Sequence, residues 1–141
     1  MADKISTRVE ILKDEFGDIG SWEDKYKHII QKGKELDSLN DSYKDDKFLV
    51  KGCQSKVWFH AEMKDGIVYF QGDSDAAIVR GIVALLLYVY SGSSPDEILA
   101  TKPIFLAEMG LREHLSMSRS NGLSAMLKQI SLYAIAFKTQ M

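Results

Sequence analysis

Cysteine is almost absent from this sequence, since Cys53 is the single one among 141 residues. One thiol excludes an internal disulfide, a CxxC redox pair and an iron–sulfur cage held by this chain alone, because such a cage needs about four thiolates. A lone thiol fits a reducing compartment better than an oxidising one. The first residues carry acids and no apolar run, so we expect no signal peptide and a cytoplasmic protein.

An excess of charge of either sign is also missing. The 18 Lys and Arg residues nearly balance the 20 Asp and Glu residues, and the formal net charge is -2. A nucleic-acid-binding surface needs a basic stripe, whereas here basic residues alternate with acids, so we expect no nucleic-acid partner. The most apolar stretch, residues 76–90, is shorter than the ~20 residues of a membrane span, and Arg80 interrupts it. It predicts a buried helix in a soluble protein without membrane association.

Histidine and proline are scarce as well. The three histidines, His28, His60 and His114, show no ligand spacing with Cys53, so no metal site is predicted. Two prolines and ten glycines leave no linker or low-complexity segment in the chain. A chain of this length fits one domain, and we expect a single domain over residues 1–141.

The middle of the chain has the pattern of a small antiparallel sheet. Apolar and polar residues alternate over 57–64, as in a strand with one buried face. Asp65-Gly66 then predicts a two-residue hairpin turn, since both residue types tolerate positive φ. The partner strand is expected over 67–71, and the short apolar run 48–50 predicts a third strand.

Helices are predicted on both sides of this sheet. Their signals are apolar residues at helical spacing and N-terminal capping patterns, and they occur at residues 5–16, from Ser21, at 76–90, from Ser94, at 103–109 and at 122–138. Asp73 or Ser74 is the expected cap of the helix at 76–90, and residues 116–121 are expected to form a loop. The predicted fold is α+β, with helices packed on a three-stranded antiparallel sheet.

The surroundings of Cys53 resemble a loop tip. A free cysteine is usually a small buried filler, but this one follows Gly52 and precedes the polar run 54–56. Reactive groups tend to lie on such loops. Lys51 and Lys56 flank the thiol and are expected to favour the thiolate, which is the nucleophilic form.

Three functions are compatible with this thiol. A thiol hydrolase would need a histidine base, and His60 lies on the next predicted strand, although its position on the polar face favours an ordinary exposed residue. A sulfur carrier would use the thiolate to attack a sulfur on another protein and hold it as a persulfide. Such a carrier needs no base or metal, and it benefits from having no second cysteine that would release the sulfur by forming a disulfide. An interaction module would simply bury Cys53.

The chain resembles the SufE family. The motifs that carry the resemblance are WEDKY at 22–26, GKEL at 33–36, VKGCQSKVW at 50–58, GDSDA at 72–76 and SRSNGL at 118–123. They occur in order over most of the chain, and the pair GCQSxVW and GDSDA is specific. Proline is usual in the family at the positions of Asp37 and Met117, and its replacement should loosen the local chain because proline fixes φ.

The resemblance implies a function for the thiol. A pyridoxal-phosphate-dependent bacterial cysteine desulfurase, of SufS or CsdA type, takes sulfur from cysteine and transfers it to the cysteine of the GCQS loop, here Cys53. The SufE-like protein stimulates the desulfurase and passes the sulfur to an iron–sulfur scaffold such as SufB. It would itself need no cofactor and would act as an activator and carrier rather than a stand-alone enzyme.

The resemblance also implies a fold and a site. The fold would be shared with IscU-type scaffolds, whose further cluster-holding cysteines are missing here. The thiol would rest in an apolar recess and move out to react. The residues expected around it are Gly52, Gln54 and Ser55, which shape the loop, and Asp75 and Arg119, which contact the loop and the desulfurase. Alternatively, Asp75 only stabilises the first turn of a helix and Arg119 only closes a loop.

Overall fold

A computed structural model describes residues 4–140 of the chain. Its α-helices are α1 (Lys4–Gly17), α2 (Trp22–Glu35), α3 (Ala77–Tyr90), α4 (Pro95–Ala100), α5 (Ile104–Glu108) and α6 (Met117–Lys138). Its strands are β1 (Val57–Lys64) and β2 (Ile67–Ser74), and its short 3-10 turns are η1 (Asp41–Tyr43), η2 (Asp46–Phe48) and η3 (Arg112–His114). Helices packed on a small antiparallel sheet confirm the α+β class. No helix within residues 4–140 combines the length and the apolar character that crossing a membrane requires.

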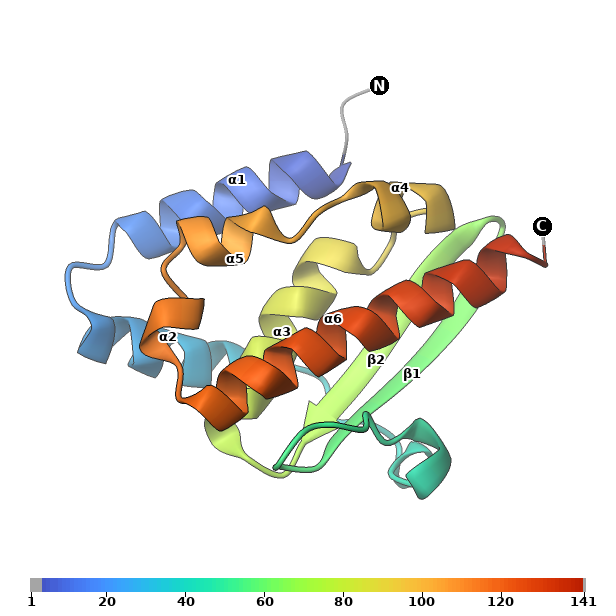
Figure 1. Ribbon diagram of the computed structural model, residues 1–141, viewed down its shortest axis with the longest axis horizontal. Coiled ribbons are helices and arrows are strands. Elements are labelled where there is room, and N and C mark those ends of the chain that lie inside the picture. The colour runs from blue at the N-terminus through green and yellow to red at the C-terminus, as the bar shows by residue number, and fades with distance from the viewer. Residues whose placement is uncertain (1–3, 141) are drawn as a thin grey trace.

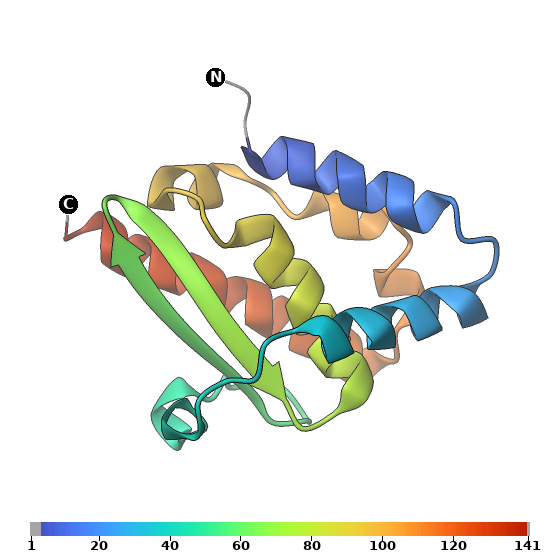
Figure 2. The same ribbon diagram turned by 180° about the vertical axis from the view of Figure 1, so that it is seen from behind.

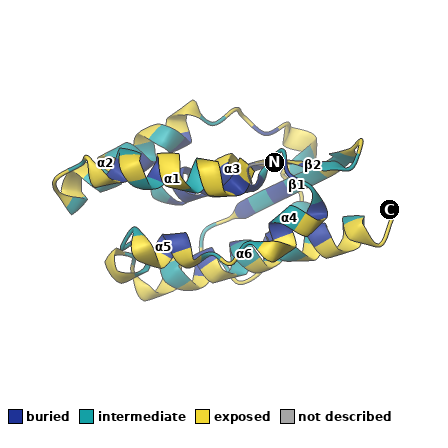
Figure 3. Cartoon of the chain, turned by 90° about the horizontal axis from the view of Figure 1, so that it is seen from above, coloured by how far each residue is buried: buried dark blue, intermediate teal, exposed yellow. Residues whose placement is uncertain are grey.

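The helices form two layers, and the apolar helix α3 lies in the layer of α1 and α2, facing the other layer. Figures 1 and 2 show α1 and α2 on one side and α6 with α4 and α5 on the other, while the β-hairpin runs beside α3 and α6. Seen from above, the buried residues face the space between the layers and the exposed residues face outwards (Figure 3). The predicted core helix therefore lies at the centre of the molecule.

Two glycines allow α2 and α3 to cross with their backbones in contact. A Cβ atom at Gly81 would lie 2.1 Å from the carbonyl oxygen of Ile29, and one at Gly33 would lie 2.8 Å from the backbone nitrogen of Gly81. No side chain fits between the two backbones at this point. The crossing fixes the start of α3, which carries one wall of the site described below.

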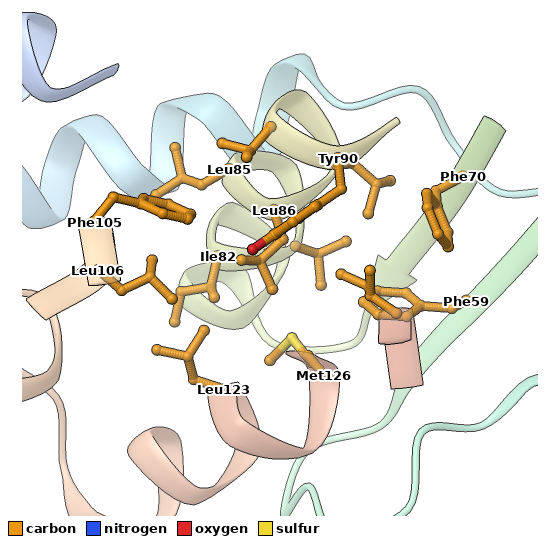
Figure 4. Packing of buried hydrophobic residues seen from close by; sticks show 14 of the residues in the cluster. Phe59, Phe70, Ile82, Leu85, Leu86, Tyr90, Phe105, Leu106, Leu123 and Met126 are labelled. Atoms are coloured by element: carbon orange, nitrogen blue, oxygen red, sulfur yellow. The ribbon is translucent and has the colours of Figure 1, made fainter. Parts of the chain in front are cut away.

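The core joins the two layers. Side chains of α3 meet Phe59 of β1, Leu123 and Met126 of α6 and residues of α5, and Met126 points toward α3 (Figure 4). These side chains are almost fully buried, and each apolar side chain of this size contributes ~1.5–3 kcal/mol on burial. Burial also raises the pKa of Tyr90 to about 12.

The sheet has two strands among the described residues, so the prediction of three strands was wrong. β1 and β2 pair from Val57 opposite Ser74 to Lys64 opposite Ile67. Residues 48–50 contribute only one isolated bridge, Leu49 to Trp58. Phe48 itself ends η2, and the segment before it is coiled into η1 and the rest of η2, whose first turns are capped by the side chains of Asn40 and Asp45. Gly52 follows with a φ of 95°, which turns the chain away from β1 before a strand can extend.

The last helix begins earlier than expected. The Ser116 hydroxyl accepts a hydrogen bond from the Arg119 backbone N–H and caps α6. Ser118 and Arg119 therefore lie in the first helical turn, not in a loop. This difference matters for function, because a helical turn fixes where the Arg119 side chain begins.

Candidate functional site

Cys53 lies in residues 50–56, which connect Leu49 to β1 and are called the cysteine loop below. This loop lies against small residues of α6. The Cys53 thiol is 3.5 Å from the carbonyl oxygen of Gly122 and donates a weak hydrogen bond to it. A Cβ atom on Gly122 would itself lie 3.5 Å from the sulfur, and one on Gly52 would lie 3.2 Å from the Cβ of Ala125. Gly52 can adopt its positive φ at low cost because it has no side chain. The small residues let this loop rest directly on the helix.

The other end of the loop is held by the residues that precede α3. The Asp75 carboxylate accepts a hydrogen bond from the Lys56 backbone N–H at 3.0 Å. The Lys56 carbonyl accepts two, from the Ser74 hydroxyl at 2.8 Å and from the Asp75 backbone N–H at 3.2 Å. Neither predicted residue caps α3, because the N-cap is Ala76 and it makes no side-chain cap. The Asp75 side chain instead contacts the cysteine loop.

A cavity of about 320 Å³ opens beside the thiol. Three elements supply its walls: the cysteine loop, α3, and α6 with its cap. Their lining residues are Cys53, Gln54, Ser55, Val79, Ile82, Ser116, Ser118, Arg119, Gly122 and Met126. The fold thus brings Arg119 to the same cavity as Cys53, across 66 positions of sequence. Asp75 does not line this cavity, and its contact with the site is through Lys56.

The electrostatic prediction for the thiol was wrong in sign. The flanking lysines were expected to favour the thiolate, but Lys51 and Lys56 are both exposed to solvent. Cys53 is partly buried, and burial raises the pKa of its thiol. The hydrogen bond to Gly122 also needs the proton. Burial and this hydrogen bond both favour the neutral thiol in the resting position.

The histidines are engaged outside the cavity. The His60 ring stacks on Tyr43 with 3.8 Å between ring centroids, and it meets Phe48 edge-on with 5.6 Å between centroids. Its Nδ1 lies 3.3 Å from the Gln71 side-chain oxygen. Its side chain is only 14% exposed, so it is an aromatic anchor for η1 and η2 rather than an exposed strand residue. His60 does not line the cavity beside Cys53, so no hydrolase pair is assembled in this structure.

The other two histidines also have partners elsewhere. His114 stacks on Trp22 at 3.9 Å, and His28 lies 2.8 Å from the Glu15 carboxylate. Within residues 4–140, no group of three or more His, Cys, Asp or Glu side chains is placed to hold a metal ion.

Sequence reasoning missed the residues on which the thiol rests. Gly122, Ala125 and Met126 were placed on a terminal helix, and Gly122 also in a family motif, but none was expected to form the surface below the cysteine loop, as they do. The spacing of Gly122 and Ala125 was a usable signal, because residues three apart lie on one helix face. Small residues on one face allow close approach of another segment, but the sequence does not say which segment approaches.

Comparison with known proteins places these motifs in a family. A family model for SufE, described as an Fe-S metabolism associated domain, matches residues 10–134. The chain belongs to the SufE family. This SufE-family chain is 40% identical over 123 residues to the sulfur acceptor protein CsdE of Escherichia coli, a match that covers 86% of this chain and 84% of CsdE.

Two further matches span almost the whole chain. A SufE-like protein of Rhizobium meliloti is 37% identical over 129 residues, which cover 88% of this SufE-family chain and 92% of the relative. The solution structure of a hypothetical protein from Thermus thermophilus aligns with a TM-score of 0.78 over 94% of this chain and 96% of that one. Because that pair is 21% identical, the structural match supports the SufE-like fold alone.

Proposed function

We propose that this protein is a sulfur acceptor that takes sulfane sulfur from a cysteine desulfurase onto Cys53 and carries it as a persulfide. The observation that carries the proposal is the placement of the chain's single thiol. It lies on a loop held by a few polar contacts, beside a cavity, with no histidine base lining that cavity. The relationship to CsdE, which is named a sulfur acceptor protein, supports the same role.

The transfer needs only thiol chemistry. The Cys53 thiolate attacks the terminal sulfur of the persulfide on the desulfurase, and a new S–S bond forms on Cys53. The S–S bond of the donor breaks, and the desulfurase cysteine leaves as a thiolate. Because Cys53 rests partly buried against the Gly122 carbonyl, which also raises the pKa of its thiol, the loop in this proposal moves outward before the attack. The pyridoxal phosphate belongs to the desulfurase, of SufS or CsdA type, and the carrier itself uses no cofactor.

The loop residues then have separate roles. Gly52 supplies the positive φ, while Gln54 and Ser55 line the cavity beside the thiol. Asp75 holds the resting loop through Lys56, and Arg119 faces the cavity where the partner would approach. In this proposal the protein works in the cytoplasm as an activator of the desulfurase and passes the sulfur to a SufB-like scaffold for iron–sulfur cluster assembly.

The test is mass spectrometry of the intact protein after incubation with a CsdA- or SufS-type desulfurase and L-cysteine. We expect one added sulfur atom, which is lost on reduction and is absent in Cys53→Ser. An unmodified Cys53 with both desulfurase types contradicts the proposal. Stimulation of the desulfurase that is undiminished in Cys53→Ser would instead favour an interaction module. Model-ester hydrolysis that depends on His60 would favour the hydrolase.

A further inference from the structure

We propose that the cavity beside Cys53 binds a small thiol that carries a carboxylate, and that this thiol removes sulfane sulfur directly from Cys53. The inference rests on the proposed function, since Cys53 has sulfur to give only as a persulfide. It adds a substrate class to the same site: a low-molecular-weight acceptor in addition to protein partners.

The shape and lining of the cavity suit such a ligand. Its volume of about 320 Å³ lies at the lower end of the ~300–1,000 Å³ range of small-molecule sites. Val79, Ile82 and Met126 give it an apolar wall, and the hydroxyls of Ser116 and Ser118 give it a polar one. An apolar recess with a few convergent polar groups is the usual make-up of a ligand site.

Arg119 provides the preference for a carboxylate. Its side chain lines the cavity, and no carboxylate within residues 4–140 forms an ion pair with it. A guanidinium group presents paired donors that match the two oxygens of a carboxylate. With the carboxylate on Arg119 and the thiol toward Cys53, the ligand would span the polar wall of the cavity.

The transfer step balances without any added oxidant. The sulfur of the acceptor thiolate attacks the terminal sulfur of the Cys53 persulfide and forms a new S–S bond. The bond between that terminal sulfur and the Cys53 Sγ breaks, and its electron pair leaves with Cys53 as a thiolate. The terminal sulfur keeps its proton, so the products are the acceptor persulfide and free Cys53.

The experiment compares two thiols that differ by one carboxylate. Cys53 is loaded chemically with sodium tetrasulfide, and the excess reagent is removed. The persulfidated protein is then discharged with N-acetylcysteine or with N-acetylcysteamine, and the loss of sulfur is followed by intact-mass spectrometry. Trapping with iodoacetamide identifies the acceptor persulfide. The readout is the discharge rate with N-acetylcysteine divided by the rate with N-acetylcysteamine, measured for each protein variant. Because both thiols are used on every variant, differences in their intrinsic reactivity cancel when variants are compared.

We expect Arg119→Gln to lower the rate with N-acetylcysteine relative to that with N-acetylcysteamine about threefold to tenfold, as for one charge-assisted contact of an exposed side chain. Arg119→Lys should retain most of this preference. Arg112→Gln is the matched control, since Arg112 has the same charge but bonds Ser124 and does not line the cavity. Thermal melting checks that each variant is folded. A ratio that is unchanged in Arg119→Gln, or equally lowered in Arg112→Gln, overturns the inference.

Chemical loading keeps this test separate from the proposed function. If a desulfurase fails to load Cys53 while the chemically loaded protein prefers N-acetylcysteine through Arg119, the proposed partner is wrong and the cavity assignment holds. If a desulfurase loads Cys53 but the two thiols discharge it with the same ratio in all variants, the cavity assignment fails. Arg119 is then a contact for protein partners only.

Discussion

Cys53 and Asp75 hold the resting loop at different points, and at Lys56 the Asp75 backbone N–H and the Ser74 hydroxyl add two further hydrogen bonds. The thiol has one weak hydrogen bond, to the Gly122 carbonyl at 3.5 Å, while the Asp75 carboxylate has one, to the Lys56 backbone N–H at 3.0 Å. A typical hydrogen bond contributes ~0.5–1.5 kcal/mol net. Release of the loop therefore breaks few interactions, as a carrier that must present its thiol to a partner requires.

The first prediction concerns the pH dependence of the Cys53 thiol. Only the thiolate reacts quickly with iodoacetamide, and burial raises the pKa of Cys53, so the thiolate fraction at a given pH is lowered. In the folded protein we expect the alkylation rate to rise with pH through a midpoint above the ~8.5 of an ordinary cysteine. At pH 7 the urea-unfolded chain should react faster. A midpoint below the ordinary value would mean that the lysines outweigh burial.

The second prediction concerns the Asp75 contact. Asp75→Ala removes the acceptor of the Lys56 N–H, so the loop should open more often and expose the thiol. We expect iodoacetamide to modify Cys53 several-fold faster, on the order of the factor of ten that ~1.4 kcal/mol represents. Asp96→Ala is the control, because Asp96 is an exposed acid paired with Lys138. Equal rates in the two variants would show that Asp75 does not restrain the loop.

Among the elements, α2 and α3 cross with their backbones in close contact. Gly81 lies against the Ile29 carbonyl with no room for a side chain. Such a contact fixes the separation of the two helices, and through α3 it fixes the position of Val79 and Ile82 in the cavity wall. The site therefore depends on a helix crossing that its own residues do not make.

The third prediction tests this crossing. In Gly81→Ala the new Cβ would lie 2.1 Å from a backbone oxygen, so the helices must separate, at a cost of ~3 kcal/mol or more. In Gly33→Ala the new Cβ would lie 2.8 Å from the Gly81 backbone nitrogen, so this variant should lose less stability. It provides a measurement if Gly81→Ala does not fold. Gly17→Ala meets nothing within 4 Å and should be neutral. Urea denaturation measures all three, and equal stabilities would refute the crossing.

The elements that could be predicted well from the sequence are those marked by a specific turn or capping motif. Asp65 and Gly66 both have positive φ, as the predicted hairpin turn requires, and Ser94 makes the predicted capping box at Pro95. The third strand failed because the run 48–50 is apolar but too short to outweigh the turns before it. The start of α6 was misplaced because polar residues in a first turn resemble a loop, and only the Ser116 cap distinguishes them.

Across the whole molecule, the site joins segments that sequence separates. The cysteine loop could be recognised from its composition, and the resemblance to the SufE family pointed to Asp75 and Arg119. The cavity could not be predicted, because it exists only where the loop, α3 and α6 meet. The group that Asp75 bonds, the Lys56 backbone N–H, could not be predicted either, because local patterns place Asp75 in the first turn of a helix.

The last prediction separates the stability of the core from access to the thiol. Met126 and Ile130 lie one turn apart on α6, and each is 1% exposed, but only Met126 lines the cavity beside Cys53. Met126→Ala and Ile130→Ala should each destabilise the fold by ~2–5 kcal/mol, measured by urea denaturation. Under conditions where both variants are folded, Met126→Ala alone should speed alkylation of Cys53, because it enlarges the space beside the sulfur. The same acceleration in Ile130→Ala would mean that access follows global opening of the core rather than the cavity itself.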